Sequence, residues 1–226
     1  MSRRSLLSVV VSLGVLASAC ARETSAQVAS SAAIVRDDTA SVSRLLEGVR
    51  GVNALACELA TRSVDMHGSW SRFGSLGGNP LEMDSAAATL IAWIQRDHND
   101  PAVVPRLRAA MHDSDRCVRR VAASFLGRVE HPSAVSALLA ALDDPSAETR
   151  YVAAIGLGVA DEPPGALQPL VRRLRDESAA VRRVAAWALG ALENRDALLP
   201  LIDLLERDSD ARVRQAAAWA IGEISG

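Results

Sequence analysis

Apolar residues in the second half of the chain recur at intervals of three and four positions. In residues 181–190 the apolar positions are Val181, Val184, Ala185, Ala188 and Leu189. Residues at these spacings lie on one face of an α-helix, so the pattern predicts an amphipathic helix. A second helix is predicted after each such segment, with apolar faces at Val135, Leu138, Leu139 and Leu142, at Leu167, Leu170, Val171 and Leu174, and at Leu198, Leu201, Ile202 and Leu205.

This pair of helices repeats along the chain. An aspartate stands ahead of each first helix, an arginine follows six residues later, and a glycine lies near the helix end. The three sets are Asp113, Asp144, Asp176 and Asp208; Arg119, Arg150, Arg182 and Arg214; and Gly127, Gly158, Gly190 and Gly222. Successive members of each set are 31, 32 and 32 residues apart. A fixed period of this length predicts an array of stacked helical hairpins.

We interpret the repeated aspartates and arginines as a structural ladder. A carboxylate just ahead of a helix can accept hydrogen bonds from free backbone N–H groups, and it meets the positive end of the helix dipole. Stacking is expected to bring each arginine near the aspartate or the turn carbonyls of an adjacent unit. Each repeated glycine is expected either to supply a positive-φ stop or to let helices approach closely.

Residues 176–207 resemble the HEAT repeat, in the short form first named from phycobilisome lyases. The resemblance is carried by Asp-x4-Val-Arg-x2-Ala-Ala-x2-Leu-Gly followed by a leucine-rich second helix. It extends over residues 113–226 and, more weakly, over residues 86–111. It implies an all-α fold, a right-handed α-solenoid of stacked helical hairpins (an ARM-type superhelix). Such repeats serve as generic binding surfaces, so the resemblance implies a protein partner without identifying it.

The N-terminal residues predict export. Arg3 and Arg4 precede an apolar run at residues 6–19, which is too short to span a bilayer and is typical of a signal peptide. Residues 16–20 resemble a bacterial lipoprotein box in which Cys20 would be acylated, although Ala17 stands where that family usually has Leu. Ordinary cleavage at a nearby site stays open, as does the choice between the general and twin-arginine routes. The predicted location is the periplasm, either free or as a membrane-anchored lipoprotein.

We divide the chain into four parts. These are a signal peptide (1–20), a flexible tether rich in Ser, Ala and Thr (21–40), divergent N-terminal helices with a Gly-rich loop (41–84), and the HEAT-like array (85–226). The Gly-rich loop carries Trp70 and Phe73. These two rings are interpreted either as part of a connector that packs on the N-terminal helices or as a recognition loop for a partner.

The chain has three cysteines, Cys20, Cys57 and Cys117. In an oxidising compartment Cys57 and Cys117 could form a disulfide. Because a helical array of this size does not need a covalent staple, we favour two unpaired thiols.

The residues that could carry chemistry are few. The four histidines are His67, His98, His112 and His131, and none is followed by Glu, unlike the His-Glu pairs that bind two iron atoms in the related deoxyhypusine hydroxylase. No pair of Cys or His has the spacing of a zinc site. We therefore expect no catalytic set, no metal and no cofactor.

Charge narrows the choice of partner. The chain has 25 basic and 27 acidic residues, a net charge of −2, which leaves no broad basic face for nucleic acid. The densest basic cluster is Arg172, Arg173 and Arg175, placed between the apolar positions of a second helix. We interpret this cluster either as a solvated helix surface or as the contact for an acidic peptide or protein in the groove of the array.

These features together predict a non-catalytic scaffold for protein–protein interaction in the bacterial envelope. The alternatives are an enzyme or lyase-like accessory subunit that uses the same groove, and a stability module within a larger envelope complex. Contact with a membrane is expected only through a lipid anchor or the signal segment. Trp219, Ile221 and Ile224 lie at or near the open end of the array, where a homodimer could form.

Overall fold

The computed structural model of the chain describes residues 39–50 and 100–226. The described residues belong to one compact unit, Asp37–Gly226. Its elements in chain order are α2 (Thr39–Gly48), the 3₁₀ turn η2 (Pro101–Val103), α6 (Val104–Ala110), α7 (Arg116–Gly127), α8 (Pro132–Ala141), α9 (Ala147–Val159), α10 (Leu167–Arg173), α11 (Ala179–Ala191), the 3₁₀ turn η3 (Arg195–Ala197), α12 (Leu198–Arg207) and α13 (Ala211–Ser225).

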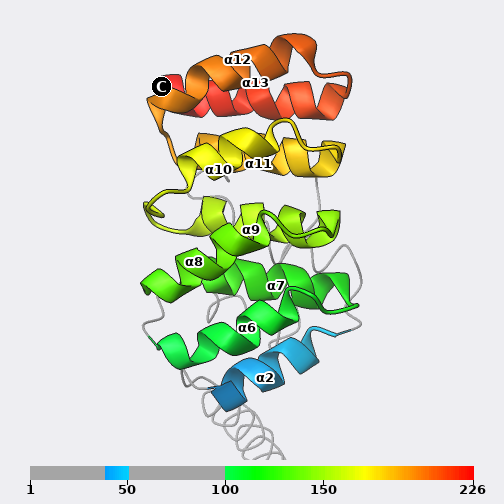
Figure 1. Ribbon diagram of the computed structural model, residues 1–226, viewed down its shortest axis with the longest axis vertical. Helices are drawn as coiled ribbons and strands as arrows, with labels where there is room; N and C mark the ends of the chain where they lie inside the picture. The colour runs from blue at the N-terminus through cyan, green and yellow to red at the C-terminus, as the bar shows by residue number, and fades with distance from the viewer. Residues whose placement is uncertain (1–38, 51–99) are drawn as a thin grey trace, which may run out of the picture. The chain divides into compact units, whose positions relative to one another are not determined.

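The helices form a stack in chain order, with α2 and α6 at one end and α12 and α13 at the other (Figure 1). The first helices of successive units pack against one another, α7 on α9, α9 on α11 and α11 on α13. Each second helix packs against the first helix that follows it in the chain, as α8 does on α9, α10 on α11 and α12 on α13. No β-strand runs through the described residues. The prediction of an all-α solenoid of helical hairpins is therefore confirmed.

Small apolar side chains line the contacts between first helices. The fully buried alanines recur in pairs, at Ala122 and Ala123, Ala153 and Ala154, and Ala185 and Ala186. Larger side chains fill the remaining space, and Phe125, Leu157 and Leu189 recur at the same position of successive units, each fully buried. Burying a side chain of this size stabilises the fold by about 1.5–3 kcal/mol. The hydrophobic core is thus a continuous column shared between neighbouring units.

Each first helix starts three residues after its ladder aspartate, and its N-cap residue lies between them, two residues after the aspartate. The N-cap residues are Asp115, Ser146, Ser178 and Asp210, all in the extended region. The backbone N–H of each N-cap residue donates to the preceding ladder aspartate at 2.8 to 3.0 Å. The ladder aspartates therefore accept from a backbone N–H, as expected, but that N–H lies in the turn before the helix.

Of the two roles expected for the repeated glycines, close approach of helices is the one found. A Cβ added to Gly158 would lie 3.0 Å from the Cα of Ala188, and one added to Gly190 would lie 2.7 Å from the Cα of Ala220. None of the repeated glycines has a positive φ. Among the glycines of the described residues, Gly165 is the one with a positive φ. At Gly127, Gly158 and Gly190 the missing side chain lets the next first helix approach the backbone, whereas Gly222 in the last first helix has nothing within 4 Å.

Cys117 is buried at the start of α7 and is disulfide-bonded. The expectation of an unpaired thiol is therefore wrong for this residue. The bonding partner lies outside the described residues, where the other two cysteines, Cys20 and Cys57, are both located. A helical array can dispense with a staple, but a buried thiol in the first turn of α7 still forms a disulfide where another cysteine lies within bonding distance.

Candidate functional site

Arg150 and Arg182 join consecutive units through ion pairs with the next ladder aspartate. Arg150 donates to Asp176 from Nε at 2.8 Å and from Nη2 at 2.9 Å. Arg182 donates to Asp208 in the same two-pronged geometry, at 2.6 and 3.0 Å. In both pairs the aspartate follows the arginine by 26 residues. A planar guanidinium that meets a carboxylate with two parallel bonds fixes orientation as well as distance.

The four ladder arginines also fasten the turn of their own unit. Each donates from Nη1 to the backbone carbonyls five and six residues earlier, at 2.7 to 3.2 Å. The expectation placed such carbonyls in an adjacent unit. The structure instead gives one arginine two tasks, closing its own turn and, in Arg150 and Arg182, clamping the next unit.

The ladder begins at a residue that the repeat pattern does not contain. Arg50, just after α2, donates to both oxygens of Asp113 at 2.9 and 2.8 Å. This contact lowers the pKa of Asp113 below its ordinary value of 3.8. Sequence reasoning missed Arg50 because no aspartate precedes it at the repeat spacing, and only its position after a short apolar helix could have suggested the role.

Pairing also sets the ionisation of the other ladder aspartates. The hydrogen bonds from Arg182 lower the pKa of Asp208. Burial pushes the pKa of Asp176 upward, but the bonds from Arg150 and from the backbone N–H of Ser178 outweigh it, so that the net shift is downward. The arginine contacts therefore keep the buried carboxylates of Asp176 and Asp208 ionised.

One rung of the ladder is not formed. Arg119 donates to the carbonyls of Asp113 and Ser114, but no ion pair joins it to Asp144 among the described residues, and its Nε is buried without a partner there. The Asp144 carboxylate lies 3.8 Å from Nδ1 of His112 instead. Asp144 follows Arg119 by 25 residues, whereas the paired aspartates follow by 26. The single 31-residue step in the repeat falls at this rung.

The predicted arginine cluster on α10 is divided by the structure. Arg173 is half-buried and contacts Asp143 at 3.2 Å and Asp176 at 3.4 Å, so it links second helices and supports the ladder. Arg172 and Arg175 are exposed, and neither is joined to another described residue by an ion pair. Two of the three guanidinium groups therefore remain accessible to an acidic partner.

Three of the predicted site residues cannot be placed. Trp70 and Phe73 of the Gly-rich loop and the candidate lipidation site Cys20 lie outside the described residues. Their roles stay predictions.

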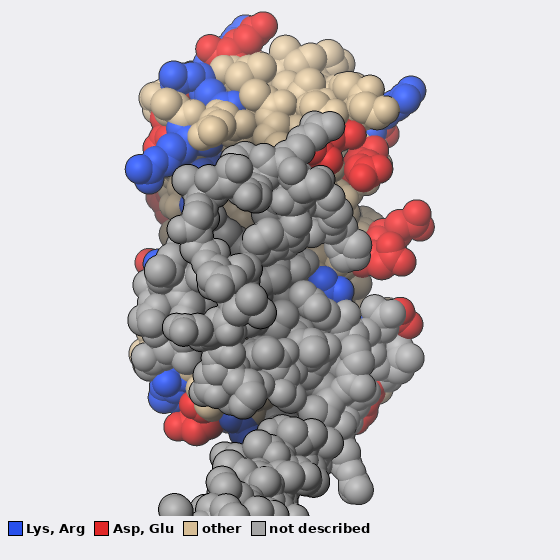
Figure 2. Space-filling model, turned by 180° about the vertical axis from the view of Figure 1, so that it is seen from behind, with Lys and Arg blue, Asp and Glu red and all other residues tan. Residues whose placement is uncertain are grey.

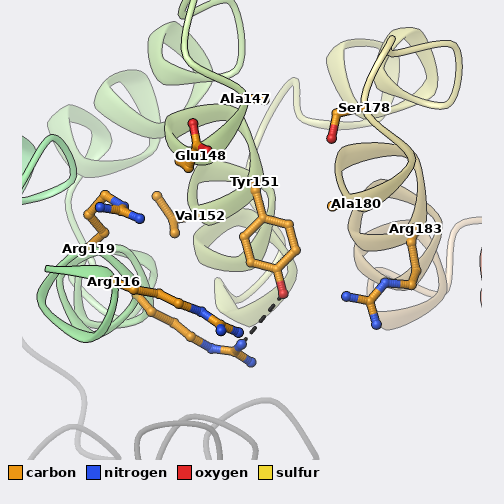
Figure 3. A pocket seen from close by; sticks show the side chains of 10 residues that line it. Arg116, Arg119, Ala147, Glu148, Tyr151, Val152, Ser178, Ala180 and Arg183 are labelled. Atoms are coloured by element: carbon orange, nitrogen blue, oxygen red, sulfur yellow. Dashed lines mark hydrogen bonds between the residues drawn. The ribbon is translucent and has the colours of Figure 1, made fainter. Parts of the chain in front are cut away.

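A cavity of about 230 Å³ opens between α7, α9 and α11 (Figure 3). The side chains that give it its character are Arg116, Arg119, Arg120, Glu148, Tyr151 and Arg183. Figure 3 shows Arg116 extending from α7 beneath the Tyr151 ring and Arg183 reaching in from α11 on the other side. Arg116 and Arg120 were not among the predicted site residues, because no local pattern connects residues on three different helices.

The end of the stack at α12 and α13 exposes apolar side chains. Leu199 is 79% exposed, and Ile202 and Trp219 are each 39% exposed. Ile224 was expected at or near this open end, but it is buried and does not contribute to the exposed surface. Figure 2 shows uncharged surface over this end, flanked by acidic and basic side chains. Dimerisation through this end stays a prediction.

No three His, Cys, Asp or Glu side chains gather into a metal-binding group within residues 39–50 and 100–226. Within the same residues, no helix has the length and apolar character needed to cross a bilayer.

A comparison with known protein families agrees with this architecture. The sequence matches the pattern of HEAT repeats over residues 80–158 and again over residues 135–222, more than half of the chain. No curated protein matches it. Among solved structures, the complex of CpcE and CpcF of phycocyanin lyase from Nostoc sp. PCC7120 is similar at 23% identity over 72% of this chain and 98% of that one, with a TM-score of 0.48. A designed armadillo repeat protein in complex with the peptide (KR)4 is similar at 17% identity over 82% of this chain and 92% of that one, with a TM-score of 0.42.

Proposed function

The chain belongs to the HEAT-repeat family, and on that premise we propose that it is an exported, non-catalytic scaffold that holds an acidic protein partner. The observation that carries the proposal is the ladder. The pairs Arg150–Asp176 and Arg182–Asp208 fix each unit against the next, so the exposed side chains of the second helices occupy set positions. A surface that is ordered before binding loses less conformational entropy when a partner arrives.

The partner contact is assigned to Arg172 and Arg175. Both are exposed on or next to α10, while Arg173 between them is held by Asp143 and Asp176. A guanidinium recognises a carboxylate through paired hydrogen bonds, and it does so best on a rigid support. This arrangement supports an acidic segment as the part of the partner that docks here.

Export is supported by two independent features. The apolar run behind Arg3 and Arg4 has the length of a signal peptide. Cys117 is disulfide-bonded, and structural disulfides persist mainly in oxidising compartments such as the periplasm. Mass spectrometry of the mature N-terminus tests export. A chain that begins at an acylated Cys20 or at another residue of the predicted cleavage region supports the proposal, whereas a retained Met1 on a cytoplasmic protein refutes it.

Site-specific photo-crosslinking tests the scaffold role in the full-length chain. A photoreactive residue replaces Arg172 in one variant and Gln215, an exposed residue of α13, in the control. In envelope fractions we expect one discrete adduct at position 172 and none at position 215. Adducts at both positions, or at neither, contradict docking on α10. An accessory subunit of an enzyme would in addition change the turnover of the captured protein, which separates that alternative from a passive scaffold.

A further inference from the structure

The missing rung and the cavity beside it are parts of one feature. Because Asp144 follows Arg119 at 25 rather than 26 residues, the Arg119 guanidinium keeps its two carbonyl bonds and makes no bond to a ladder carboxylate. The same side chain lines the cavity between α7, α9 and α11. The positive charge that Arg150 and Arg182 share with a ladder carboxylate is, in Arg119, left at the wall of a cavity.

The other charges of the cavity are also mostly positive. Its lining holds four guanidinium groups against one carboxylate, those of Arg116, Arg119, Arg120 and Arg183 against that of Glu148. Arg116 and Arg183 are exposed, and no hydrogen bond or ion pair joins either of them to another described residue.

The single carboxylate of the cavity, that of Glu148, interacts with the charge of Arg119 and leaves Arg116 and Arg183 without a carboxylate from the lining. Glu148 accepts a hydrogen bond from the Ser146 hydroxyl at 3.0 Å. Its pKa is lowered, first by a hydrogen bond to its own backbone N–H and then by Ser146. Figure 3 shows its oxygens turned away from Arg116 and Arg183, at the opposite end of the Tyr151 ring. The basic end of the cavity is therefore free of carboxylate from its own lining.

Tyr151 adds a neutral donor between the guanidinium groups. The hydroxyl oxygen of Tyr151 accepts a hydrogen bond from Arg120 Nη1 at 3.5 Å, so its hydroxyl proton is not used in that bond and can be donated to a ligand. Figure 3 places this hydroxyl between the ends of Arg116 and Arg183.

We propose that this cavity binds a compact oxyanion, with Arg116 and Arg183 as the two clamping cations and Tyr151 as the hydroxyl donor. Guanidinium groups and a phenol are all donors, and together they match the acceptor oxygens of a phosphate or of closely paired carboxylates. A volume of about 230 Å³ has room for such a group and a few waters, since a water occupies about 30 Å³ in the liquid. The anion can be free in solution or carried on the acidic side chains of a protein, and both sources present the same chemistry.

Isothermal titration of the full-length chain with inorganic phosphate and with a short oligoglutamate peptide tests this site. The double variant Arg116→Ala/Arg183→Ala removes two exposed side chains that bond to no described residue, so its circular dichroism and melting temperature should match the parent. It should bind the anion at least about tenfold more weakly, as expected for the loss of charge-assisted hydrogen bonds. Tyr151→Phe should weaken binding by a smaller factor without changing the net charge.

The matched control is Arg172→Ala/Arg175→Ala, which removes the same charge from α10 and should leave binding in the cavity unchanged. Phosphate binding that is lost in the cavity variant alone identifies a free anion as the ligand. Peptide binding that is lost in the same way identifies acidic side chains. The proposal is overturned if neither phosphate nor the peptide binds. It is also overturned if the cavity variant and the control weaken binding equally. Because the α10 variant also lacks the proposed partner contact, failure of the scaffold proposal and failure of this one give different results.

Discussion

Removing Arg150 should destabilise the array far more than removing Arg119, although the two residues occupy the same position in neighbouring repeats. Arg150 is 5% exposed and contacts Asp176, whose own side chain is 2% exposed. In Arg150→Ala the Asp176 carboxylate keeps only the N–H of Ser178 at 3.0 Å and Arg173 at 3.4 Å.

The size of the effect follows from what each substitution leaves unpaired. Removing one partner of a buried ion pair typically costs about 3–5 kcal/mol, because the other charge loses its compensation. Asp176 keeps the weaker contact to Arg173 at 3.4 Å, so we expect about 3 kcal/mol, the lower end of that range. Arg119→Ala loses only the bonds to two turn carbonyls, and we expect about 1 kcal/mol. A change of 1 kcal/mol moves the melting temperature by about 2–4 °C in a domain of this size. Arg150→Ala should therefore melt roughly 10 °C below the parent and Arg119→Ala only a few degrees below it.

Urea and thermal unfolding followed by circular dichroism at 222 nm measure both losses. A second substitution, Asp176→Ala in the Arg150→Ala background, should restore part of the stability because it removes the orphaned charge. Equal losses in Arg119→Ala and Arg150→Ala would refute the reasoning, since they would mean that the ion pair adds nothing beyond the carbonyl bonds. No recovery in the double variant would refute the account of the buried charge.

Three further predictions concern the packing, the charge and the covalent link of the array. Gly190→Ala places a Cβ 2.7 Å from the Cα of Ala220 and should cost about 1–3 kcal/mol, whereas Gly222→Ala, with nothing within 4 Å, should be neutral or stabilising by up to about 1 kcal/mol, both measured as urea midpoints. Because pairing lowers the folded-state pKa of Asp208 below 3.8, its contribution is complete above about pH 4 and is lost as the pH falls through the lower folded value; unfolding midpoints between pH 6 and pH 2 should therefore fall less steeply in Arg182→Ala. Cys117 should resist alkylation in the denatured, unreduced chain and become labelled after reduction, so labelling without reductant contradicts the disulfide.

The repeat pattern predicted which residues form the ladder but not how they pair. Asp176, Arg182 and Gly190 could be recognised because they recur at a fixed period, and the period is set by the length of one helical hairpin. The repeat period did not predict which aspartate each arginine pairs with. Arg182 lies six residues from Asp176 in sequence but bonds to the carboxylate of Asp208, 26 residues away. Which of the two it meets depends on the rise and rotation between stacked units.

The sequence by itself determined the helices, their order and the side on which each is apolar, since these follow from spacings of three and four residues within a single hairpin. Only the tertiary structure decided that Arg50 begins the ladder, that Arg119 leaves it, and that Arg116, Tyr151 and Arg183 surround one cavity. The physical reason is one of range. Helix formation and amphipathicity depend on neighbours within about two turns, whereas these contacts join residues on successive layers of the stack, where a register difference of one residue is enough to separate a guanidinium from its carboxylate.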